Sequence, residues 1–296
     1  MANDRPRPRY HRSTDLWRAW HPRCRLSVVL AVPFGAGQRR KVLRVWRVEP
    51  GFATFCCARC GETGYVHDRH ARKSDPQKLA RLRAEAAEYD RIHKIERLSK
   101  ARWLWSQRKP PINSIVERYL CERRRIKCPL PATLGFLPAR GEYAPAMIAA
   151  FGMAHEVEPG VIVIADDAVR SVHITRLLPD GSDRERGDQA KIMIGHSVGF
   201  PIVLAPPNDL LGMAITEGIE DALTVHQSTG LGAWTAGAAS RLPALADAIP
   251  SYVECVTVLV DDDADGRRFA GELADRIRAR RIQVRQVVAN QWRPAA

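Results

Sequence analysis

Short apolar runs alternate with segments of helical spacing in the C-terminal third of the chain. Four of the runs have the length of buried strands: residues 210–216, 231–235, 256–260 and 282–289. Three segments between them repeat apolar residues every three or four positions: residues 219–228, 239–248 and 266–280. Such alternation predicts an α/β domain over about residues 208–290, with a parallel sheet and right-handed crossovers.

The pattern upstream is different. Residues 74–108 have helical spacing, with a capping residue and Pro76 at the start, and predict one basic connecting helix. Residues 112–206 combine a helical segment with β-like runs at 161–165 and 172–178, which predicts an α+β middle region with a small antiparallel sheet. Residues 15–70 contain short β-like runs separated by glycine-rich turns.

Acidic residues follow two of the C-terminal strands. Glu217-Gly218 ends the first run, and Asp261-Asp262-Asp263-Ala264-Asp265-Gly266 ends the third. Because the carboxyl ends of adjacent parallel strands open onto one crevice, these side chains are expected to face the same point. Crowded carboxylates repel one another unless a cation lies among them, and hard oxygen ligands favour Mg²⁺ or Mn²⁺. The alternative is that the aspartates form a solvated turn that caps the following helix.

The order Glu-Gly, then Asp-x-Asp-x-x-Gly after a later strand, resembles the Toprim domain of primases, topoisomerases and some nucleases. The resemblance implies that Glu217 is a general acid or base and that Asp261 and Asp263 are catalytic magnesium ligands, with Asp265 as a further ligand. Many relatives carry a Lys-Asp/Asn-Asp motif after the last Toprim strand, and the present sequence, ending Ala289 to Ala296, lacks it.

Charge is distributed unevenly over the 296 residues. The first 130 residues carry 31 Lys and Arg against 12 Asp and Glu, whereas the remaining 166 carry 15 against 21. A basic arm of this size attracts polyphosphate, and nucleic acid is the commonest such partner. The alternative is a set of solvated charged helices without a ligand.

Cysteine usage indicates a metal. No apolar stretch approaches the length of a membrane span, and the N-terminus lacks a signal-peptide core, so we expect a cytoplasmic protein without membrane contact. In a reducing compartment, four of the seven cysteines within the first 60 residues favour metal binding over disulfides. His21 and Cys24 form one pair, Cys57 and Cys60 form another, and β-like runs separate the pairs. This arrangement predicts a zinc ribbon with these four ligands.

The ribbon is similar to the zinc-binding domain of Toprim primases, although His precedes Cys in the first pair and the loop between the pairs is long. Cys56 could replace Cys57, and His67 or His70 could replace His21. A CxxC pair without metal, buried or redox-active, is a further alternative.

The middle region also resembles the segment that precedes Toprim in phage and mobile-element primases. Residues 114–120, 173–177 and 191–195 match a helix and two later boxes of that group. The resemblance implies that Arg176 and Lys191 bind nucleotide phosphates or template. The alternative is that both are ordinary surface cations on strands.

Taken together, the resemblances imply a DNA primase-like nucleotidyltransferase that makes short RNA primers. Its partners would be single-stranded DNA, nucleoside triphosphates and a replicative helicase. A Toprim nuclease and a non-catalytic nucleic-acid-binding partner of a helicase are the alternatives. Gly195-His196-Ser197-Val198-Gly199 matches the G-x-S-x-G nucleophile elbow, but the β-branched residues after it favour a turn between strands.

Overall fold

The computed structural model describes the backbone of residues 10–13, 16–21, 26–30, 43–49, 52–57, 63–67, 76–187 and 189–289, and side chains only from residue 76 onward. The chain divides into two compact units, Met1–Arg83 and Ala84–Ala296. Within the first unit, two antiparallel sheets of three strands each are described. One contains β1 (Tyr10–Ser13), β2 (Leu16–His21) and β3 (Leu26–Leu30), and the other contains β4 (Leu43–Glu49), β5 (Phe52–Cys57) and β6 (Thr63–His67).

The predicted connecting helix is confirmed as α1 (Pro76–Ser106). Its last turns pack against an antiparallel four-stranded sheet in the order β12-β11-β8-β7. The strands are β7 (Leu134–Leu137), β8 (Ala146–Phe151), β11 (Ser171–Arg176) and β12 (Lys191–Gly195). The opposite face of this sheet packs on α2 (Ile115–Arg118) and the π-helical turn η1 (Tyr119–Arg123) that continues it. A separate hairpin pairs β9 (His155–Glu158) with β10 (Val161–Val163), and η2 (Asp166–Ala168) is a single turn.

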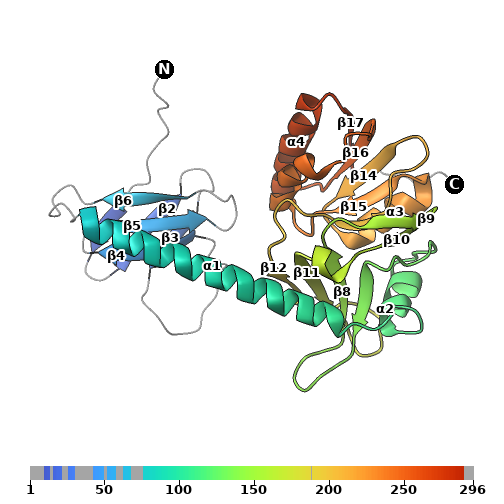
Figure 1. The fold of residues 1–296 in the computed structure, drawn as a ribbon, viewed down its shortest axis with the longest axis horizontal. Helices are drawn as coiled ribbons and strands as arrows, with labels where there is room; N and C mark the ends of the chain where they lie inside the picture. The colour runs from blue at the N-terminus through green and yellow to red at the C-terminus, as the bar shows by residue number, and fades with distance from the viewer. Residues whose placement is uncertain are drawn as a thin grey trace. The chain divides into compact units, whose positions relative to one another are not determined.

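The predicted parallel sheet is confirmed. Its five strands lie in the order β13-β15-β14-β16-β17, and only the edge strand β13 runs antiparallel to its neighbour (Figure 1). The strands are β13 (Ile202–Ala205), β14 (Gly212–Thr216), β15 (Gly232–Thr235), β16 (Cys255–Val260) and β17 (Gln283–Val288). β14 lies between β15 and β16, so the two strands that end in acidic residues are direct neighbours.

Helices cover both faces of this sheet, which explains why its inner strands β14, β15 and β16 are almost entirely apolar, whereas the edge strand β17 contains polar residues. On one face, α4 (Ala264–Ala279) and η3 (Ala239–Ala248) pack through Phe269, Leu273 and Leu242 against Ile215 and Val258. On the other face, α3 (Ile219–Thr229) packs partly on this sheet and partly on the four-stranded sheet, through a shared apolar cluster. The two sheets are therefore joined by a common core around α3.

The segment 239–248 differs from its prediction as an α-helix, because it forms a 3-10 helix. Pro243 lies inside it and cannot donate a backbone N–H to an α-helical ladder. The G-x-S-x-G segment lies between strands β12 and β13, as expected for a turn and unlike a nucleophile elbow, which needs a helix after the serine. Among the described residues, every helix is too short or too polar to cross a bilayer.

Candidate active site

The register of the parallel sheet brings the two acidic motifs together. Ile215 of β14 lies opposite Val258 of β16. Two residues further along each strand, Glu217 and Val260 reach the same level, and Asp261 is the next residue after Val260. Glu217 and Asp261 therefore leave the sheet side by side, at the carboxyl ends of neighbouring strands, where α/β sheets bind their ligands.

Glu217 is half-buried, and its surroundings make ionisation unfavourable. Removal from water raises the pKa of its carboxyl to about 7, and the adjacent Asp261 carboxyl, which shares a hydrogen bond with it, acts in the same direction. The Ala239 backbone N–H donates to the Glu217 carboxylate and opposes the rise. The Thr235 hydroxyl donates to the Glu217 carbonyl oxygen at 2.6 Å and holds the strand end in place. A carboxyl with a pKa close to neutrality can both take up and release a proton.

The aspartate run serves the following helix as well. Asp263 is the N-cap of α4, and its Oδ1 accepts a hydrogen bond from the Gly266 N–H at 2.7 Å. Asp262 is exposed and pairs with Arg267. Asp265, in the first turn of α4, is half-buried. The capping interpretation is thus confirmed for Asp263.

Gly266 is required by close packing in this turn. A Cβ atom built on Gly266 would lie 2.6 Å from the Asp261 carbonyl oxygen and 2.9 Å from the Asp261 Cβ. Only a residue without a side chain allows α4 to begin so close to the strand end. The glycine of the Asp-x-Asp-x-x-Gly motif therefore fixes where Asp261 lies.

The carboxylates fit a hard divalent cation by their chemistry. Glu217 and Asp261 are in contact, and Asp263 also raises the Glu217 pKa. Burial raises the pKa of Asp221 in the first turn of α3, and the charges of Glu220 and then Asp261 raise it further. Four carboxyl groups thus repel one another at one edge of the sheet, and a cation held by oxygen ligands would relieve this repulsion. Among the described residues, no three His, Cys, Asp or Glu side chains are already gathered into a metal site.

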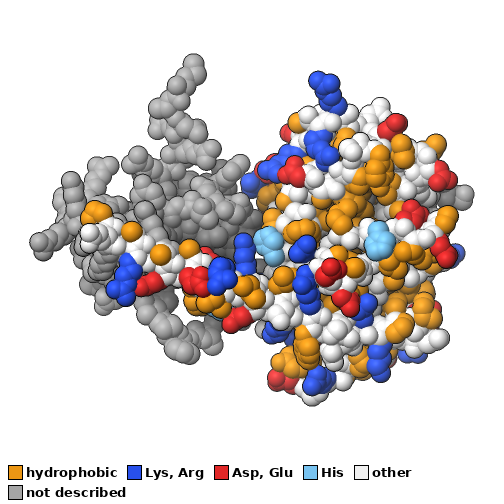
Figure 2. All heavy atoms as spheres, viewed as in Figure 1, with side chains coloured by type: hydrophobic (Ala, Val, Ile, Leu, Met, Phe, Trp, Pro, Cys, Tyr) orange, Lys and Arg blue, Asp and Glu red, His pale blue; other side chains and the backbone are white. Residues whose placement is uncertain are grey.

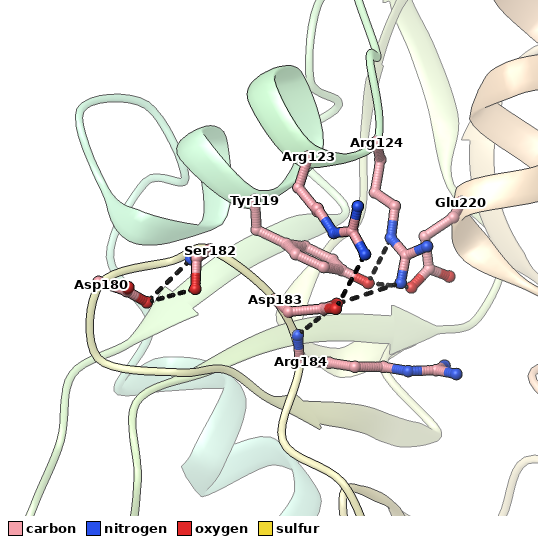
Figure 3. A network of polar contacts seen from close by, with 8 residues as sticks. All are labelled: Tyr119, Arg123, Arg124, Asp180, Ser182, Asp183, Arg184 and Glu220. Atoms are coloured by element: carbon pink, nitrogen blue, oxygen red, sulfur yellow. Dashed lines mark hydrogen bonds and ion pairs between the residues drawn. The ribbon is translucent and has the colours of Figure 1, made fainter.

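A partly buried polar network ties α3 to the middle region (Figure 3). The Tyr119 hydroxyl donates to Glu220 Oε1 at 2.6 Å, and Arg124 Nε donates to the Tyr119 oxygen at 3.0 Å. Arg123 and Arg124 both reach Asp183, at 3.2 Å and 3.5 Å. Burial alone would raise the pKa of Glu220, but nearby Lys191 together with Tyr119 and Arg124 holds that pKa below its usual value. Glu220 is therefore a stable anion three residues after Glu217.

The two predicted phosphate-binding cations lie on opposite faces of the four-stranded sheet. Thr175 pairs with Lys191, so Lys191 shares its face with His173, whereas Arg176 points to the face that packs on α1. Lys191 affects the charges around α3, because it lowers the pKa of Glu220 and also that of His173. Burial is the main reason that the His173 pKa falls to about 4, which leaves this ring neutral. Because they lie on opposite faces of the sheet, Arg176 and Lys191 cannot both bind the same phosphate group.

The predicted zinc ligands lie in the first unit. His21 ends β2 and Cys57 ends β5, but their side chains are not among those described, as is also true of the alternatives Cys56 and His67. Cys24, Cys60 and His70 lie outside the described residues altogether.

Three residues at the site were not predicted from the sequence. Tyr119 and Glu220 meet across 101 positions of the chain, and no local pattern indicates such a pairing. Arg241 is the single cation in segment 239–248, which apart from Asp247 contains only apolar and small residues. That isolation was a usable signal, because a charge inside an apolar turn commonly has a specific partner.

We expect Tyr119→Phe to lower the free energy of unfolding by about 2 kcal/mol, because it removes the buried hydroxyl that donates to the charged, half-buried Glu220. Urea unfolding would measure this change. Tyr143→Phe is the matched control, since Tyr143 is 61% exposed. Equal stability of the two variants would contradict a stabilising role for the network.

Two family models match parts of the chain. Residues 96–204 match a family described as a domain of unknown function, DUF7146. Residues 212–293 match the Toprim domain. No curated protein matches the chain. Among solved structures, the crystal structure of the zinc binding and RNA polymerase domains of the Aquifex aeolicus primase is similar, with 13% identity and a TM-score of 0.40 over 95% of this chain and 74% of that chain.

The match to the Toprim family covers β14 to β17 and both acidic motifs. The strands that carry Glu217 and Asp261 therefore lie in the segment of the chain that is similar to the Toprim domain.

Proposed function

We propose that this chain is a magnesium-dependent nucleotidyltransferase of the primase kind, which makes short RNA primers on single-stranded DNA. The observation that carries the proposal is the contact between Glu217 and Asp261 at the ends of adjacent parallel strands, inside the segment that matches the Toprim domain. Such an arrangement serves reactions in which charge builds up on phosphate oxygens.

Each acidic residue has a role that follows from its surroundings. Asp261 and Asp263 would hold magnesium, which when bound neutralises the triphosphate and its leaving pyrophosphate. Glu217 would accept the proton of the attacking 3′-hydroxyl at its carboxylate. The hydrogen bonds from Ala239 and Thr235 would keep the Glu217 carboxylate and backbone oriented during that transfer.

Lys191 contributes positive charge beside the same edge. Its effects on Glu220, Asp221 and His173 indicate that it lies near the first turn of α3. We propose that Lys191, on that face, attracts the phosphates of a nucleotide. Arg176, on the other face, would contact template instead.

One assay tests the proposed function. The purified chain is incubated with single-stranded DNA, labelled nucleoside triphosphates and magnesium, and the products are separated by size. Short RNA would support primer synthesis, and cut DNA would favour a Toprim nuclease. Binding of DNA without either product would favour a non-catalytic partner of a helicase.

We also propose a structural zinc ion in the first unit, held by His21, Cys24, Cys57 and Cys60. Metal analysis of the purified protein is expected to find about one zinc per chain, and Cys60→Ser is expected to lose it, because a tetrahedral site needs all four ligands. Cys121→Ser is the control, since Cys121 is exposed on η1. Retention of zinc by Cys60→Ser would mean that other residues bind the metal.

A further inference from the structure

A line of cations continues the face by which α1 docks on the sheet domain. Ala101 and Trp105 of α1 are fully buried against the four-stranded sheet. Arg97 is four positions and Lys94 seven positions before Ala101, so both lie on the same face of the helix. Both side chains are exposed. Figure 2 shows Lys and Arg side chains beside a His side chain where α1 meets the domain.

Arg241 of η3 lies within electrostatic range of Arg97 in this line. It is half-buried, and its Nε donates to the hydroxyl of the buried Ser197 at 2.8 Å. Burial lowers the pKa of Arg241, and the charge of Arg97 lowers it further. The pKa of His196 is lowered by partial burial and then by Lys94, Arg241 and Arg97, which shows that these groups converge.

Within the described part of the chain, these cations have no acidic partner. Among the side chains that the structure describes, no Asp or Glu forms an ion pair with Lys94, Arg97 or Arg241. The Arg241 guanidinium is half-buried, its hydrogen-bond partner Ser197 is neutral, and like charges lie near it. Its positive charge is therefore energetically unfavourable in the absence of a ligand. A bound anion would stabilise these positive charges.

The cluster also lies beside the candidate catalytic carboxylate. The Ala239 N–H donates to the Glu217 carboxylate, and Arg241 is only two residues further along the same 3-10 helix. The Arg241 N–H donates to the Ala238 carbonyl oxygen at 3.0 Å, which makes this turn compact. An anion at Arg241 would therefore lie close to the acidic edge of the sheet.

We propose that Arg241, together with Lys94, Arg97 and His196, forms a binding site for a phosphate group of a nucleotide or nucleic acid beside Glu217. The arginine guanidinium offers several N–H donors in one plane, which suits phosphate oxygens, and Ser197 fixes its orientation. The assignment of the ligand rests on the proposed function. The phosphate belongs either to the backbone of a single strand or to a nucleoside triphosphate.

Binding measurements on the full chain test the site. Arg241→Gln is compared with Arg278→Gln, which removes the same charge from a side chain that pairs with Asp275 on α4. One arm titrates a labelled single-stranded oligodeoxynucleotide, and the other titrates ATP, both in EDTA so that no divalent ion contributes. We expect Arg241→Gln to weaken the binding of one of the two ligands about tenfold. If that ligand is DNA, the slope of the logarithm of the binding constant against the logarithm of the salt concentration should also become shallower by about 0.7.

The ligand that is weakened identifies the source of the phosphate. If Arg241→Gln binds both ligands as tightly as Arg278→Gln, the site does not exist. Should Arg241→Gln fail to fold, the double variant Lys94→Gln/Arg97→Gln decides, because it changes only exposed side chains. These binding measurements do not depend on turnover, so they separate the site from the proposed function. If the parent chain makes no primers but Arg241→Gln loses phosphate binding, the site is supported and the proposed function fails. If the parent chain makes primers but Arg241→Gln keeps its phosphate binding, only the site is overturned.

Discussion

Glu217→Gln is expected to reduce product formation by about a hundredfold or more, while the fold and the binding of single-stranded DNA remain intact. The substitution keeps the size and hydrogen-bonding capacity of the side chain but removes the group that takes up the proton. Losses of this size are typical when one acid–base or preorganised electrostatic element is removed. Primer synthesis on single-stranded DNA with magnesium measures the effect.

The aspartates give the matched comparison within one motif. Asp261→Asn and Asp263→Asn are expected to lose activity to a similar extent and to require more magnesium, because each removes a carboxylate from the crowded edge. Asp262→Asn is the control, since Asp262 is exposed and paired with Arg267. Full activity in all four variants would place any catalytic site elsewhere and favour the non-catalytic partner.

Much of the C-terminal domain follows from sequence pattern. Runs that are apolar without alternation are typical of strands covered on both faces. β14, β15 and β16 are such strands, and β17 lies beside β16 at the edge of the sheet. The position of Glu217 beside Asp261 follows from the same reasoning, because the carboxyl ends of neighbouring parallel strands must meet. Periodicity alone supplied neither the neighbouring placement of β14 and β16 nor the addition of antiparallel β13 at the edge of the sheet.

Sequence reasoning was weakest where contacts join distant segments. The pairing of Tyr119 with Glu220 and the approach of α1 to Arg241 depend on how two sheets share a core around α3. Register also decided a point that sequence left open, since Arg176 and Lys191 separate onto two faces only once β11 and β12 are aligned. Local spacing predicts elements, but the packing between them selects which charges meet.

The two interpretations of the aspartate run are compatible in the structure. Oδ1 of Asp263 accepts the capping hydrogen bond from Gly266, and a carboxylate has a second oxygen that can face a cation. Capping then orients the ligand instead of competing with it. The start of α4 and the acidic edge are consequently one structural unit. A change at the start of this helix should therefore displace the carboxylates.

Gly266→Ala tests that coupling directly. The added methyl group would lie 2.6 Å from the Asp261 carbonyl oxygen, so either α4 or the end of β16 must move. We expect a loss of about 1–3 kcal/mol in the free energy of unfolding, as for overpacked sites. We also expect about a hundredfold loss of activity, because small displacements of catalytic groups carry large penalties.

Gly271→Ala, in the same helix, is the matched control for Gly266→Ala. A Cβ at Gly271 meets nothing within 4 Å, and alanine favours the helix over glycine by about 1 kcal/mol, so this variant should be as stable as the parent or more stable. Chemical unfolding and primer synthesis, measured on both variants, separate the helix-wide effect from the local one. If Gly266→Ala matched Gly271→Ala in both measurements, the close approach of α4 to Asp261 would have no part in holding the acidic edge in place.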